Sequence, residues 1–132
     1  MLFRSYIDKH NLNNNVKVLD YKKNPFKYMK LSNVFILSSI YEGLPNVLLE
    51  AICIKKFVIS SNCSTGPAEI LNYGKGGLLF KIQDHADLAK KIIFYSKNKL
   101  KLRKKINYAY NKLERFNYNY NLNRYLKAIL NN

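Results

Sequence analysis

Two glutamates in the stretch YEGLPNVLLE, residues 41 to 50, are the side chains of this sequence best placed to do chemistry. The chain holds only 8 acidic residues against 23 basic ones, so a close pair of carboxylates stands out. On one continuous helix Glu42 and Glu50 would lie about 12 Å apart along the axis, too far for a shared proton or metal ion. Pro45, however, suits the first turn of a helix and not its middle. We therefore expect Glu42 in a loop and Glu50 at least one turn inside the following helix, facing one ligand.

The residues between the two glutamates are suited to phosphate and sugar. The unpaired N–H groups of a first helical turn, and the partial positive charge there, favour an anion. Gly43 allows close approach of a ligand, and the backbone amides of Asn46 and Val47 are the expected donors. A carboxylate such as Glu50 can accept two hydrogen bonds from the vicinal hydroxyls of a ribose. Spacing alone leaves open a plainer alternative, in which Glu42 caps the helix and Glu50 is solvated.

Strand and helix signals alternate along the chain from residue 16 onward. Short apolar runs predict strands at residues 16–20, 34–39, 57–62 and 76–80. Helix signals predict helices at residues 25–31, 45–54 and 66–74, and from the cap Asp84 onward. This order predicts an α/β fold with a short parallel sheet flanked by helices on both faces. Ligands of such sheets bind beyond the carboxyl ends of the strands, so SSIYEGLPN and SNCSTGPAE are the expected ligand loops.

A chain of 132 residues fits a single domain. We expect a Rossmann-like domain over residues 1–96 and a helical, basic C-terminal extension over residues 97–132 that packs on it. The two cysteines, Cys53 and Cys63, do not have metal-site spacing and are expected to be reduced core residues.

The net charge of +15 is concentrated in the C-terminal part of the chain. From Leu88 to the end there are 12 basic residues and one acid, Glu114. The alternatives are a solvated helical face and a surface for polyanions, among which anionic membrane is favoured over nucleic acid. No apolar run reaches the roughly 20 residues of a membrane span, and the N-terminal stretch has a polar break too early for a secretory signal. We expect a cytoplasmic protein and leave open a peripheral position at the inner face of the cytoplasmic membrane.

The segments VFILSSIYEGLPNVLLEA, VISSNCSTGPAEIL and GKGGLLF closely resemble the C-terminal, nucleotide-sugar-binding half of family-4 glycosyltransferases. These are retaining enzymes of the B-type two-Rossmann fold. The resemblance extends upstream to NVKVLDYKKNPFKYMKLSNVF and downstream to about residue 95. Its most specific part is the Glu-x7-Glu pattern formed by Glu42 and Glu50.

The resemblance implies a role for each residue of the pattern. Glu50 is expected to bind the ribose hydroxyls of a nucleoside diphosphate sugar, and Glu42 to act beside the donor sugar near the point of transfer. The same comparison implies retention of configuration, a glycan or lipid-linked acceptor, and no metal or cofactor besides the donor substrate. Further donor contacts are implied for the backbone of Gly43, Leu44, Asn46 and Val47, and base contacts for a loop with Tyr21, Lys22 and Asn24.

The sequence departs from the family pattern in two places. Lys55 and Phe57 stand where members usually have glycine and proline, which loses a favourable left-handed helix cap worth about 1 kcal/mol. The basic segment that neutralises the diphosphate in the family has no counterpart here, because Arg4 and Lys9 are not in a matching motif. We therefore expect an incomplete enzyme that needs an N-terminal acceptor domain, which a separate chain could supply. A non-catalytic nucleotide-sugar-binding module is the alternative.

Overall fold

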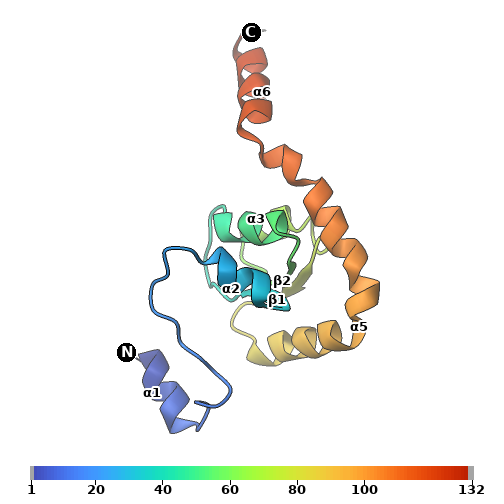
Figure 1. Ribbon diagram of the computed structural model, residues 1–132. Helices are drawn as coiled ribbons and strands as arrows, with labels where there is room; N and C mark the ends of the chain where they lie inside the picture. The colour runs from blue at the N-terminus through green and yellow to red at the C-terminus, as the bar shows by residue number, and fades with distance from the viewer. Residues whose placement is uncertain (1, 131–132) are drawn as a thin grey trace.

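The computed structural model describes residues 2–130, with the side chain of Leu2 excepted. Three strands and several helices alternate along the chain (Figure 1). In chain order the elements are α1 (Leu2–Lys9), α2 (Phe26–Leu31), β1 (Val34–Leu37), α3 (Asn46–Cys53), β2 (Phe57–Ser61), α4 (Pro67–Ile70), β3 (Leu78–Phe80), α5 (His85–Asn111), the 3-10 helix η1 (Leu113–Phe116) and α6 (Tyr118–Leu130).

The three strands form one parallel sheet in the order β1-β2-β3. The central strand β2 is buried along its whole length, as expected for a strand covered on both faces. Its side chains alternate between two apolar clusters: Val58 packs with residues of α2, α3 and α4, whereas Phe57 and Ile59 pack with the side of α5 that carries Leu102. Figure 1 accordingly shows α3 and the first half of α5 on opposite sides of the strands. The predicted α/β fold class is confirmed.

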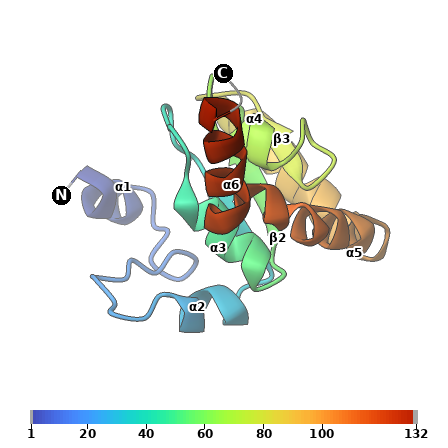
Figure 2. The same ribbon diagram turned by 90° about the horizontal axis from the view of Figure 1, so that it is seen from above.

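The prediction of a strand at residues 16–20 is wrong. This segment has no regular secondary structure, and the side chains of Val18 and Leu19 are exposed. A strand requires a neighbour with which to exchange backbone hydrogen bonds, and within the described residues β1 pairs only with β2. The N-terminal helix α1 was not predicted from the sequence. Together with the irregular segment that follows it, α1 lies apart from the sheet (Figure 1 and Figure 2).

The helix predicted at residues 66–74 is much shorter. Only Pro67–Ile70 is helical, because Asn72, Tyr73 and Gly74 all adopt positive φ and turn the chain toward β3. The guanidinium of Arg115 donates to the carbonyl oxygens of Glu69 (2.8 Å) and Ile70 (2.7 Å), which stabilises the open end of this short helix.

The expectation that the left-handed cap of α3 is lost without a glycine is wrong. Lys55 itself adopts the left-handed conformation, with φ of 56°. Its N–H donates to Ile52 O (2.8 Å), and the N–H of Lys56 donates to Ala51 O (2.9 Å). These two bonds form the Schellman motif that closes α3. The ammonium of Lys55 lies 4.5 Å from the ring centre of Tyr110, a cation–π contact that offsets part of the backbone cost.

The long helix α5 begins as predicted, with the Asp84 carboxylate accepting a hydrogen bond from the N–H of Asp87 at 2.8 Å. This bond is the main cause that lowers the pKa of Asp84. Asn98 interrupts the helix with non-helical φ and ψ; after it, Leu102 and Ala109 are buried against the domain. α6 buries none of its described side chains and projects away from the sheet (Figure 1). The division at residue 96 stays a prediction.

The two cysteines differ in their surroundings. Cys63 is buried, as expected, but Cys53 is exposed at the end of α3, so its assignment to the core is wrong. None of the helices within residues 2–130 is long and apolar enough to cross a membrane.

Candidate functional site

The two expected ligand loops meet at the carboxyl ends of β1 and β2. The hydroxyl of Ser61 donates to the carbonyl oxygen of Ser39 (2.6 Å), and the thiol of Cys63 donates to the same oxygen (3.1 Å). The hydroxyl of Thr65 donates to the carbonyl oxygen of Glu42 at 2.5 Å. Because three side chains of the second loop bind backbone oxygens of the first, the two loops hold each other in place.

A glycine brings the two loops into backbone contact. Gly66 has φ of 82°, and a Cβ atom added to it would lie 1.9 Å from the carbonyl oxygen of Gly43 and 2.7 Å from Pro45 Cδ. No residue with a side chain fits this position without moving the first loop. Gly66 therefore positions the chain between Glu42 and α3.

The two glutamates lie on different elements, as predicted. The carboxylate of Glu42 is half-buried in the loop after β1 and accepts a hydrogen bond from the hydroxyl of Ser39 at 2.6 Å. Glu50 is half-buried on α3, one turn after the start of the helix at Asn46. This bond from Ser39 holds the Glu42 carboxylate in one orientation.

The helix between them begins at the predicted place. Pro45 precedes α3 at the N-cap, and the first hydrogen bond of the turn runs from the N–H of Leu48 to Pro45 O (2.9 Å). The N–H groups at the first two positions of an α-helix have no acceptor within the helix, so those of Asn46 and Val47 are available to an anion. Of the other predicted contact residues, Gly43 and Leu44 are exposed.

Of the three residues predicted to contact the nucleotide base, two line the same hollow and one does not. Tyr21 and Lys22 line a hollow of about 430 Å³ whose wall also contains Pro25 and Tyr28. Tyr21 is 91% exposed, so its ring is free to stack on a planar ligand. Asn24 does not line this hollow; its side-chain oxygen accepts a hydrogen bond from the N–H of Phe26 (3.1 Å) at the start of α2.

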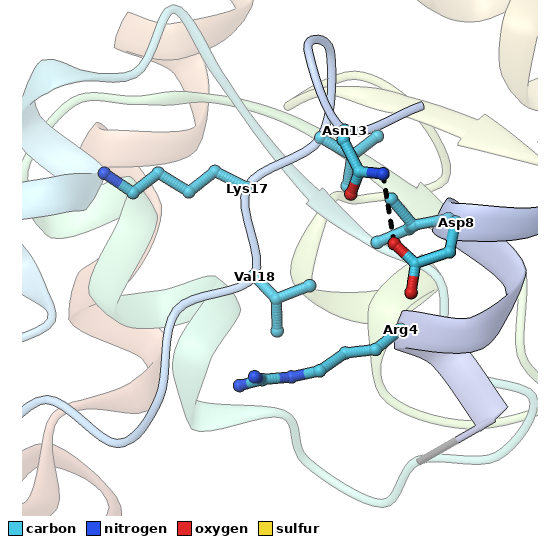
Figure 3. A pocket seen from close by; sticks show the side chains of 7 residues that line it. Arg4, Asp8, Asn13, Lys17 and Val18 are labelled. Atoms are coloured by element: carbon cyan, nitrogen blue, oxygen red, sulfur yellow. Dashed lines mark hydrogen bonds between the residues drawn. The ribbon is translucent and has the colours of Figure 1, made fainter. Parts of the chain in front are cut away.

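A separate hollow of about 380 Å³ lies between α1 and the extended segment that follows it (Figure 3). Three of its polar side chains have partners: Asn13 donates to the Asp8 carboxylate (3.0 Å), and Arg4 forms an ion pair with Asp20 (2.6 Å), which lies outside the hollow. Arg4 is therefore engaged away from the glutamates, in agreement with its exclusion from the site on sequence grounds.

Sequence reasoning missed the residues that hold the two loops together. The signal was present in part, since polar hydroxyl residues at the end of a buried strand must find hydrogen-bond partners. Ser61 is the buried hydroxyl of this kind, and the thiol of Cys63 is buried beside it. The residues overlooked are Ser39, Ser61, Cys63, Thr65 and Gly66.

The parallel sheet, the helices on both faces and the paired loops beyond the strand ends define a Rossmann-like domain with its candidate site at the usual edge of the sheet. The chain belongs to the glycosyl transferases group 1 family, whose model matches residues 2–113. The resemblance seen in the sequence is thereby confirmed.

An uncharacterized glycosyltransferase of Methanocaldococcus jannaschii is 48% identical over 88 residues, which cover 57% of this chain and 22% of that protein. Among solved structures, TarM matches with a TM-score of 0.85 at 24% identity, over 96% of this chain and 26% of TarM. HepE of Anabaena, solved in complex with UDP, matches with a TM-score of 0.84 at 21% identity, over 98% of this chain and 36% of HepE. These structural matches show the fold. The chain spans between a fifth and about a third of the length of these proteins.

Proposed function

We propose that these residues bind the nucleoside diphosphate sugar of a retaining glycosyltransferase. The observation that carries this proposal is the pairing of the loops after β1 and β2, with Glu42 held before the uncapped start of α3 and Glu50 one turn after it. Family membership supports glycosyl transfer, and the UDP bound to HepE supports a nucleotide on this fold.

Each part of the donor has a proposed partner. Glu50 accepts hydrogen bonds from the ribose hydroxyls, and the free amides of the first turn of α3 face the diphosphate. Glu42, oriented by Ser39, lies beside the transferred sugar and is the proposed catalytic residue. The base stacks in the hollow lined by Tyr21 and Lys22. Remaining donor contacts come from the backbone of Gly43, Leu44, Asn46 and Val47.

Transfer to an acceptor needs more than these residues provide. We propose that an N-terminal acceptor domain completes the cleft and supplies the cations that neutralise the diphosphate. The acceptor is then a glycan or a lipid-linked sugar, and the new bond keeps the configuration of the donor. No metal ion takes part in this proposal.

A ligand-observed NMR screen of the purified chain tests the donor site. UDP and GDP, each with and without an attached sugar, are offered at millimolar concentration in the presence of EDTA. We expect saturation transfer to the ribose and base protons of one nucleotide series, weaker for the other. Absence of saturation transfer to any of the four ligands contradicts donor binding by this chain.

A further inference from the structure

Three lysines and a tyrosine surround a hollow of about 380 Å³ between α5 and the loop before β3; they are Lys75, Lys104, Lys105 and Tyr108. Lys75 stands just before β3, whereas the candidate donor loops stand just after β1 and β2. Because the strands are parallel, this hollow lies at the opposite end of the sheet from the donor loops. The hollow is therefore separate from the candidate donor site.

The walls of the hollow are held rigidly together. Gly76 packs so closely on α5 that an added Cβ would lie 3.0 Å from Ala109 Cβ. The ammonium of Lys105 donates to the carbonyl oxygen of Gly74, and the N–H of Gly76 donates to Leu71 O at 2.8 Å. These contacts hold the loop against the helix, so the backbone positions of the lysines are fixed relative to one another.

No acidic residue stands close to these lysines in the sequence. The two segments that line it, residues 70–83 and 88–113, contain no aspartate or glutamate. Burial, and next the neighbouring Lys104, lower the pKa of Lys105, which means that its positive charge is poorly stabilised by its surroundings. An anion in the hollow would relieve this repulsion.

Tyr108 adds a neutral donor. Its phenolic oxygen accepts a hydrogen bond from the side-chain amide of Asn72, so the phenolic hydrogen remains available to another acceptor. The side chains that line this hollow offer lysine ammonium groups and a tyrosine hydroxyl as donors, and such donors suit the several oxygens and the double charge of a phosphate group.

We propose that Lys75, Lys104, Lys105 and Tyr108 form a second anion site that takes a phosphate group. The phosphate belongs either to a soluble phosphate ester or to the headgroup of an anionic lipid at a membrane surface. Both sources offer the same chemistry to the lysines. This site is independent of the donor site proposed above.

Two titrations of the isotope-labelled chain test the site and separate the sources. In the first, inorganic phosphate is added and the backbone amide shifts are recorded; in the second, the chain is sedimented with phosphatidylglycerol-containing vesicles and with phosphatidylcholine vesicles. We expect shifts at residues 74–76 and 104–105, or retention by the phosphatidylglycerol vesicles alone. Phosphate shifts identify a soluble ester as sufficient, and retention without phosphate shifts identifies the lipid headgroup.

The double variant Lys104→Gln/Lys105→Gln should weaken this binding about tenfold or more, because two charge-assisted hydrogen bonds are lost. Lys97→Gln/Lys101→Gln removes the same charge from exposed positions of the same helix and should change binding less than twofold. Lys104→Gln alone keeps the bond from Lys105 to Gly74 and serves if the double variant does not fold. Equal weakening in the Lys97/Lys101 control, shifts confined to residues 43–47, or no binding in either titration would overturn the proposal.

Discussion

Replacement of Gly66 by alanine is expected to lower the free energy of unfolding by about 3 kcal/mol or more. The left-handed backbone alone disfavours alanine, and the added methyl group would overlap the carbonyl oxygen of Gly43, which belongs to the backbone and cannot rotate away. The first loop must therefore move or Gly66 must change conformation. Either response separates the loops that carry Glu42 and α3, so nucleotide binding should also be lost.

Gly74 provides a matched control for this change. It has a similar φ of 89°, but an added Cβ would meet nothing within 4 Å. Gly74→Ala should thus cost only about 1 kcal/mol and leave nucleotide binding intact. Urea unfolding of the two variants, followed by circular dichroism, measures the difference. Equal costs at the two positions would show that the contact between the loops contributes little.

Replacement of Glu50 by glutamine is expected to weaken nucleotide binding about tenfold or more. Glutamine keeps the size of the side chain but loses the charge that strengthens two hydrogen bonds from a ribose diol. Stability should change by no more than about 0.5 kcal/mol, because Glu50 is half-buried on the surface of α3. Binding constants are measured by calorimetry with the nucleotide that the screen identifies.

Glu114→Gln is the control for charge. Glu114 is exposed in η1 and belongs to neither of the loops that carry the candidate donor site. The Glu114→Gln change should therefore leave nucleotide binding unchanged. Unaltered affinity in Glu50→Gln would remove Glu50 from the site, and a similar loss in both variants would point to a general effect of net charge.

The core of the fold was predictable because its signals are local. Pro45 indicated the start of α3, Asp84 indicated the start of α5, and the apolar runs around Ile36 and Ile59 indicated two strands, of which the second is fully buried. Each of these signals acts within one turn or one strand, so no knowledge of the rest of the chain was needed.

The errors arose where structure depends on distant partners. Residues 16–20 have strand-like sequence, but a strand forms only beside another strand. The helix that begins at Pro67 ends early because Asn72 and Tyr73 adopt left-handed conformations, which few residues tolerate. No pattern in the sequence predicted these two conformations. The same holds for the site, where Glu42 and Glu50 were found from spacing but the contacts from Ser61 and Thr65 depend on the packing of two loops.

Backbone amide mapping with the nucleotide tests the central claim most directly. A series of 1H–15N spectra is recorded while UDP or GDP is added to the labelled chain. The account predicts that the perturbed amides gather at residues 39–47 and 61–66, with a second group at residues 21–24 beside the base. Perturbations that spread evenly over the basic surface of α5, or that leave residues 42–50 unchanged, would contradict a donor site between the two glutamates.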